Sequence, residues 1–304
     1  MSSRLAVEIA GLKLGNPVML ASGILGSSGM TLKRVVDAGA GAVVTKSLGL
    51  EPREGYPNPT LVQVECGLLN AMGLPNPGVH CFGEEIMEAK ELGVPMIVSI
   101  YGFSSGEFAD VAEIAVDAGA NALELNVSCP HVEKTGAEVG QSKELVAEVV
   151  NKVKNSVNKP IFVKLTPNVA DIVEVAEAAV EAGADAITAI NTVRAMTIDV
   201  ETKTPILANK IGGLSGPAIK PIAVRCVYEI RRSVDVPVIG CGGISTWRDA
   251  VEFMLAGASA VQIGTAIAFS GLGVFKSVTE GIDAYLKEKG FRSVGEIVGL
   301  SNRD

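Results

Sequence analysis

A side-chain amide, a hydroxyl and a thiol follow one another in the segment Asn126–His131, which reads Asn-Val-Ser-Cys-Pro-His. The preceding run, Ala122–Leu125, is rich in large apolar residues, which is typical of a buried strand, and Pro130 ends it. Cys129 therefore lies just past a strand end, in a glycine-bearing loop. A thiol held over a pocket can act as a base or a nucleophile once its thiolate is populated. Because the chain offers no clear His–Asp pair for a triad, we expect Cys129 to act as a base.

The other cysteines are expected to be inert, since buried thiols are common and usually unreactive. They are Cys66, Cys81, Cys226 and Cys241. No two cysteines form a CxxC pair, and their odd total of five argues against a disulfide framework. The same pattern argues against an iron–sulfur cluster or a Cys-rich zinc site held by this chain alone. The two histidines, His80 and His131, supply a metal centre poorly, and we interpret His131 as a loop residue.

Two lysines and three asparagines are placed where they could bind a flat, anionic ring. Lys46 and Lys164 fall at the inner ends of predicted strands. A lysine there is costly unless it meets an anion or an electron-rich ring; the alternative is that its ammonium extends to solvent. Asn70, Asn126 and Asn191 each supply two donors and an acceptor. Three converging amides would suit a ring edge with alternating N–H and C=O groups, whereas a single Asn would more simply serve a turn.

Two glycine-rich turns follow the last two predicted strands. They are Gly242-Gly-Ile-Ser245 and Gly264-Thr-Ala266. Small residues there expose backbone N–H groups at helix starts, which suits a phosphate group. Either turn alone would be weak support, but both together predict a phosphate site.

Two strand signals alternate along the chain and provide the framework for these residues. One is a proline that leads an apolar strand, at 17–22, 95–100, 160–165 and 237–242. The other is a Gly-Ala step into a strand, whose glycine suits a helix C-terminus, at 41–45, 119–125, 183–188 and 257–263. Eight such β–α units predict an α/β fold, a (β/α)8 TIM barrel. The alternative is an open doubly wound sheet.

Helical periodicity fills the segments between these strands. Apolar residues share one face of 171–182, and Thr246 with Asp249 predicts a helix N-cap and its acidic third residue. Other helices are expected to open at Thr31 and to span 106–118 and 142–157.

Four parts fall outside the repeat. Residues 5–9 and 12–14 predict an N-terminal hairpin that closes one end of the barrel. Long loops are expected after strand 2 (49–78), after strand 4 and after strand 6 (198–216), and loops of this length in a compact domain are often functional. No linker is evident, so we expect residues 1–304 to form one domain.

Polar groups recur at the predicted C-terminal ends of the strands, where the chemistry of such barrels gathers. A purely structural barrel could end its strands in generic turn residues instead. The strand ends read Ser22-Gly23, Lys46-Ser47, Ser99-Ile-Tyr101, Asn126, Lys164, Asn191-Thr192, Gly242-Gly243 and Gly264-Thr265.

Composition narrows the class of protein. The chain has 304 residues, 48% of them hydrophobic, which is ample for a large core. A net charge of −8 without runs of like charge disfavours nucleic acid as the main partner. No apolar run reaches the length of a membrane span, and the N-terminus lacks a signal-peptide core. We therefore expect a cytoplasmic protein.

Taken together, these residues resemble the dihydroorotate dehydrogenases, FMN enzymes of pyrimidine biosynthesis, over nearly the whole chain. The use of a cysteine as the base resembles class 1 of that family. The Cys-Pro-His loop and the segment 212–217 are most similar to those of class 1B, the NAD-linked catalytic subunit. That resemblance implies electron transfer to NAD+ through a partner subunit that carries FAD and a 2Fe-2S cluster, in a heterotetramer built on a homodimer. The most specific motifs are 70–76, 126–131, 190–192, 212–217 and the two glycine-rich turns.

The resemblance also implies roles for individual residues. Cys129 would be the catalytic base. The cofactor would be held by Ser22, Lys46, Ser47, Asn126, Lys164, Ile190, Gly216, Gly242, Gly243, Gly264 and Thr265. The substrate would be held by Lys46, Asn70, Ala71, Met72, Gly73, Leu74, Asn126, Asn191 and Thr192. Relatives often place Asn near the flavin at the end of strand 3, where this chain has Ser99 and Tyr101, so the resemblance implies no cofactor contact from that strand.

The implied reaction is the oxidation of dihydroorotate to orotate. Cys129 would take the C5 proton while C6 gives a hydride to FMN. One alternative is a fumarate-dependent class 1A enzyme, and another is a flavin-free barrel lyase or isomerase acting on a phosphorylated substrate. A subunit that binds flavin only for structure is disfavoured by the polar pocket.

Overall fold

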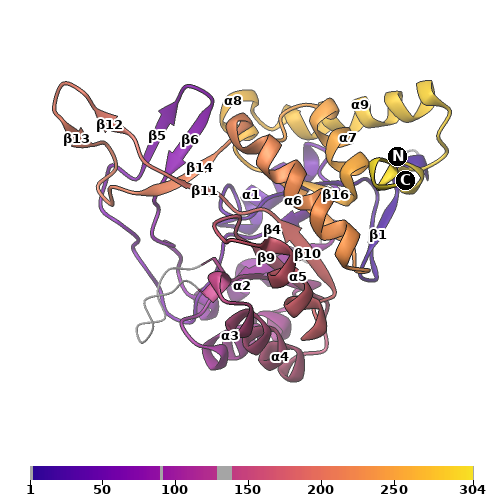
Figure 1. The fold of residues 1–304 in the computed structure, drawn as a ribbon. Helices are drawn as coiled ribbons and strands as arrows, with labels where there is room; N and C mark the ends of the chain where they lie inside the picture. The colour runs from indigo at the N-terminus through magenta and orange to yellow at the C-terminus, as the bar shows by residue number, and fades with distance from the viewer. Residues whose placement is uncertain (1–2, 90–91, 129–138, 304) are drawn as a thin grey trace.

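Eight parallel strands form a closed barrel at the centre of the molecule (Figure 1). The structure, a computed structural model, describes residues 3–89, 92–128 and 139–303. Each barrel strand pairs with the next, and the last pairs with the first, which confirms the predicted TIM barrel over an open sheet. In chain order the strands are β3 (Val18–Leu20), β4 (Ala42–Val44), β7 (Met96–Ile100), β8 (Ala122–Asn126), β9 (Ile161–Leu165), β10 (Ala186–Ala189), β15 (Val238–Cys241) and β16 (Ala258–Ile263).

Helices surround the barrel, and sequential helices from α1 to α7 pack on one another, with α9 next to α7. They bury their apolar stripes against the outer face of the strands, as helical periodicity predicts. Their bounds are α1 (Gly29–Asp37), α2 (Val79–Ala89), α3 (Ser105–Ala118), α4 (Lys143–Ser156), α5 (Ile172–Glu181), α6 (Lys220–Ser233), α7 (Trp247–Ala256), α8 (Ala266–Ser270) and α9 (Gly273–Lys289).

Local capping signals account for about half of the helix ends. Gly119 ends α3 in the left-handed region with φ of 115°, as the Gly-Ala step predicts. At the start of α7, Thr246 and Asp249 form a reciprocal capping box. The prediction that this helix opens at Thr31 was wrong by two residues, because α1 begins at Gly29. Its N-cap is Ser28, whose hydroxyl accepts a hydrogen bond from the Thr31 backbone N–H at 3.2 Å.

The N-terminal hairpin, β1 (Val7–Ile9) and β2 (Leu12–Leu14), closes one end of the barrel as predicted. Its residues Ile9 and Leu14 are buried against side chains that fill the barrel interior. That interior layer is apolar; its members include Met19, Ala42, Val44, Ile97, Ala122, Phe162, Ala186, Ile239 and Ala260.

The two long insertions meet in one antiparallel sheet, which the sequence did not predict. The insertion after β4 supplies β5 (Leu61–Val64) and β6 (Gly67–Asn70), and the chain after β10 supplies β11 (Val193–Ala195) and β14 (Gly212–Ser215). The strand order is β11-β14-β6-β5, with Gly213 opposite Asn70. A further hairpin, β12 (Ile198–Asp199) with β13 (Thr204–Pro205), projects beyond this sheet (Figure 1). The sheet thereby carries Asn70 to the mouth of the barrel.

Candidate active site

Two adjoining cavities lie at the C-terminal ends of the barrel strands. The larger has a volume of about 380 Å³, a size typical of small-ligand sites, and the smaller about 100 Å³. Both are lined by Ser22, Lys164, Asn191, Thr192, Ser215, Gly264 and Thr265, so they form one continuous site. The larger adds Lys46, Ser47, Asn70, Met72, Leu74 and Asn126, and the smaller adds Ile190, Gly216, Gly242 and Gly243.

Most residues predicted for the site are therefore brought together, and two are not. Ala71 is buried in a small core beneath the antiparallel sheet, and Gly73 packs against Tyr56; neither lines a cavity. These two residues shape the loop that carries Met72 and Leu74. The predicted base, Cys129, lies outside the described residues, as does His131.

The smaller cavity has the properties of a phosphate cradle. Gly243 has φ of 81°, and a Cβ there would lie 2.8 Å from the Gly216 carbonyl oxygen, so the turn requires glycine. Among the described residues, the backbone N–H groups of Gly243, Gly264 and Thr265 have no acceptor. The Thr265 hydroxyl donates to Ser215 at 2.8 Å. Unpaired N–H groups that converge on a small cavity suit a phosphate.

Amides and hydroxyls form a connected chain along the floor of the larger cavity. Asn126 donates through Nδ2 to the Ser47 hydroxyl at 3.0 Å, and Asn191 Nδ2 donates to Asn126 Oδ1 at 3.3 Å. Ser47 also lies 3.3 Å from the Ser22 hydroxyl. Asn70 reaches the same cavity from β6, where its Nδ2 donates to the Gly213 carbonyl at 3.2 Å. The three asparagines thus line one cavity, as the sequence predicts.

Strand β7 supports the site from behind and does not line it. Ser99 is fully buried, and its hydroxyl lies 2.9 Å from that of Ser47. The Tyr101 hydroxyl accepts a hydrogen bond from Asn76 Nδ2 at 2.9 Å, and Asn76 Oδ1 accepts from the backbone N–H of Gly78. Asn76 thereby fixes the loop that carries Leu74. This role of Asn76 is not predictable from the sequence alone.

Lys46 is a cation without a carboxylate partner among the described residues. It lines the larger cavity and is partly buried. Burial lowers the pKa of its ammonium below the ordinary lysine value. An anionic ligand would supply the missing charge.

Lys164 is also buried, but it is held from below by a polar layer. Its Nζ donates to Gln262 Oε1 at 3.0 Å and lies 3.7 Å from Glu124 Oε1. Glu124 is fully buried on β8. Sequence analysis missed Glu124 and Gln262, although each lies two residues before a predicted strand-end residue and so faces the barrel interior with it.

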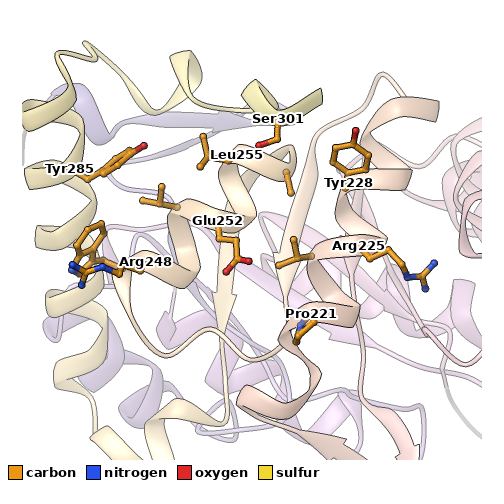
Figure 2. Close-up of a pocket in the computed structure, with 12 residues that line it drawn as sticks. Pro221, Arg225, Tyr228, Arg248, Glu252, Leu255, Tyr285 and Ser301 are labelled. Carbon is orange, nitrogen blue, oxygen red and sulfur yellow. The ribbon is translucent and has the colours of Figure 1, made fainter. Parts of the chain in front are cut away.

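A separate hollow, with a volume of about 690 Å³, lies away from this site. Figure 2 shows its residues on the outer helices; they include Tyr228 from α6, Arg248 from α7 and Tyr285 from α9. None of the predicted site residues lines it. The described chain contains no cluster of three potential metal-ligating His, Cys, Asp or Glu residues. Among its helices, none is long and apolar enough to cross a membrane.

Comparisons with known proteins show the family of this chain. Residues 4–286 match the profile of the family described as dihydroorotate dehydrogenase. A protein from Pyrococcus abyssi (strain GE5 / Orsay), named dihydroorotate dehydrogenase B (NAD(+)), catalytic subunit, is 55% identical over 98% of this chain and 99% of its own length. A protein with the same name from Methanosarcina mazei is 51% identical over 99% of this chain and 96% of its own length. Another, from Methanothermobacter thermautotrophicus, is 52% identical over 98% of each chain. The chain belongs to the dihydroorotate dehydrogenase family, a family of FMN-dependent oxidoreductases.

Proposed function

We propose that this chain oxidises dihydroorotate to orotate with FMN, in pyrimidine biosynthesis, as the catalytic subunit of an NAD-linked enzyme. The observation that carries the proposal is the continuous site at the strand ends. Counting partners among the described residues, one end presents unpaired backbone N–H groups, and the other presents a lysine without a carboxylate partner beside linked asparagines. The first arrangement suits a phosphate and the second suits an anionic pyrimidine.

The residues present fit FMN. The turns at Gly242-Gly243 and Gly264-Thr265 would hold its phosphate, together with Gly216. When bound, FMN supplies the acceptor for the two electrons that leave C6 of dihydroorotate. The residues that would contact the rest of the cofactor are Ser22, Lys46, Ser47, Asn126, Lys164 and Ile190.

The larger cavity would hold the pyrimidine. Lys46 would pair with the substrate carboxylate, and the linked amides of Asn126 and Asn191 would meet the alternating N–H and C=O groups of its ring. Asn70 and the 71–74 loop would cover it, with Thr192 at the edge. We assign Cys129 as the base whose thiolate removes the C5 proton.

Anaerobic addition of dihydroorotate is expected to bleach the flavin absorption of the purified protein. The test is a visible spectrum recorded before and after addition. If the flavin is present but stays oxidised, the cofactor assignment stands and the substrate assignment is rejected. If the protein binds no FMN, a phosphate-binding lyase or isomerase is favoured. Reoxidation of the bleached protein by fumarate, without a partner, would favour the class 1A alternative.

Orotate binding is expected to take up protons as the pH rises, up to about one per site. Without ligand, the lowered pKa of Lys46 makes its ammonium lose its proton at a lower pH than an ordinary lysine. A bound carboxylate favours the charged form and raises that pKa again. Proton uptake is therefore absent below the pKa of the free protein, largest between that pKa and the raised pKa of the complex, and lost again above the latter.

Calorimetry in two buffers of different ionisation enthalpy measures this uptake. The titration uses FMN-loaded Cys129→Ala protein, which removes the thiol that would titrate in the same range. Lys46→Met in the same background is the control, in which the uptake should vanish. Equal uptake with and without Lys46 would contradict the pairing.

The partner assignment rests on the relatives. Their name, catalytic subunit, supports a second subunit, which we propose carries FAD and a 2Fe-2S cluster and passes electrons to NAD+. We also propose a homodimer. Its support is a set of exposed apolar side chains on and beside the antiparallel sheet: Leu61, Met196, Ile198, Val200 and Ile211.

A further inference from the structure

A charged residue lies below the site, inside the barrel, without touching the cavities. Glu124 on β8 has an exposed fraction of 0% and lines neither cavity. Ala122, two residues earlier on the same face, belongs to the apolar layer that fills the barrel floor. Glu124, Gln262 and Thr188 therefore form a polar layer between the apolar layer and the ligand site.

The contacts of Glu124 leave one oxygen for Lys164. Glu124 Oε2 accepts hydrogen bonds from Gln262 Nε2 at 2.6 Å and from the Thr188 hydroxyl at 3.1 Å. Glu124 Oε1 has no hydrogen-bond partner among the described residues. The Lys164 ammonium, 3.7 Å away, is the cation that compensates it.

Stability does not explain this arrangement. A buried ion pair loses about as much in desolvation as it gains, and apolar residues of similar volume are often as stable or more so. The adjacent layer shows that this barrel can be filled with apolar side chains. Lys164, by contrast, lines both cavities. An effect of Glu124 on the ligand site would therefore pass through Lys164.

We propose that Glu124 is a positioning residue that keeps Lys164 cationic and oriented toward the cavity, so that the floor of the site presents a fixed positive charge to FMN. This inference rests on the proposed function. Gln262 completes the arrangement, because its amide donates to Glu124 while its carbonyl accepts from Lys164. Both groups are thus fixed by one side chain from β16.

The charges around Lys164 agree with this role. Burial acts to lower the pKa of Lys164, but the contacts of its ammonium with Cys241 and Glu124 act to raise it, and the net shift is upward. Burial raises the pKa of the Cys241 thiol, which keeps that thiol neutral near pH 7. Thr188 and Gln262 carry no charge, and Lys46 is the other cation that lines the larger cavity. Glu124 is therefore the neighbour that carries the negative charge.

The test is the midpoint potential of bound FMN as a function of pH in wild type and Glu124→Gln. A positive charge beside the flavin favours its reduced, anionic form. Near pH 6 the variant keeps Lys164 protonated, and its potential should lie at or above that of wild type. As the pH rises, Lys164 should lose its proton in the variant before it does in wild type. The preference for reduced FMN should then fall at least tenfold, which is about 30 mV for a two-electron couple.

A charge swap separates this role from a structural one. Glu124→Gln combined with Gln262→Glu returns a carboxylate to a position already 3.0 Å from Lys164 Nζ, and should restore the pH profile of wild type. Glu174→Gln, which neutralises an exposed acid paired with Lys143, is the matched control and should leave the profile unchanged. The proposal would be overturned if the midpoint potential of Glu124→Gln differed from that of wild type by the same amount at every pH. It would also be overturned if the swap did not restore the wild-type profile.

These outcomes are independent of the proposed reaction. Dye-coupled reduction sets the potential without dihydroorotate, so a protein that binds FMN but rejects the substrate still tests Glu124. If Glu124→Gln does not fold, the charge-swapped variant alone decides: a profile like that of wild type supports the proposal, and one that diverges with rising pH overturns it.

Discussion

Replacing Cys129 with alanine is expected to lower dihydroorotate turnover by about 10²–10⁴-fold, the range that one general base contributes. The methyl group cannot remove the C5 proton, whereas the groups that we assign to FMN belong to other residues and remain in place. The measurement is stopped-flow bleaching of the flavin under anaerobic conditions, together with the FMN content of the purified variant. Retained FMN with slow bleaching is the expected pair of results.

Two further variants give this experiment its controls. Cys129→Ser should be intermediate or weak, because a hydroxyl is a poorer base than a thiol near neutral pH. Cys81→Ala removes an exposed thiol from α2, away from both cavities, and should bleach like wild type. Bleaching of Cys129→Ala at the rate of wild type would reject the base assignment.

The barrel could be predicted from the sequence because its signals are local. Each Gly-Ala step combines a helix end with a strand start within a few residues, as at Gly119, where the left-handed φ is observed. The capping box at Thr246 likewise needs only four adjacent residues. Because parallel strands place their C-terminal ends on one side, the predicted strand order also predicted which residues share the site.

The insertions could not be predicted in the same way, because their sheet joins segments far apart in the sequence. Asn70 on β6 pairs with Gly213 on β14, a register that neither segment specifies alone. A Cβ at Gly213 would lie 2.1 Å from the Thr192 hydroxyl, so the pairing requires glycine there. The glycines of 212–217 contribute to the family resemblance, but the close packing that requires them is seen only in the fold.

Glu124 was missed for a different reason. The run Ala122–Leu125 is apolar on average, and that average predicts a strand without asking which residue faces inward. Period-two alternation places Glu124 on the same face as Asn126, toward the barrel interior. Its partners come from β9, β10 and β16 and are separated from it by 40 to 138 residues, so the network itself is visible only in the fold.

Removing the buried cation is expected to have the largest effect on stability. Lys164→Met should lower the free energy of unfolding by about 3–5 kcal/mol, because the fully buried Glu124 is left without its compensating charge. Lys154→Met is the matched control: it breaks a partly exposed ion pair with Asp185 at 2.7 Å, which contributes at most about 1 kcal/mol. Urea unfolding of the FMN-free proteins measures both, so that loss of bound cofactor does not enter the difference.

The double variant Lys164→Met/Glu124→Gln distinguishes charge from packing. Without the carboxylate no uncompensated charge remains, so most of the lost stability should return, and the two changes should be strongly non-additive. FMN should still bind weakly, because the cation that lines both cavities is absent. If Lys164→Met were as stable as Lys154→Met, the buried charge of Glu124 would not need Lys164 to compensate it. That result would contradict the ion pair as the link between the barrel interior and the site.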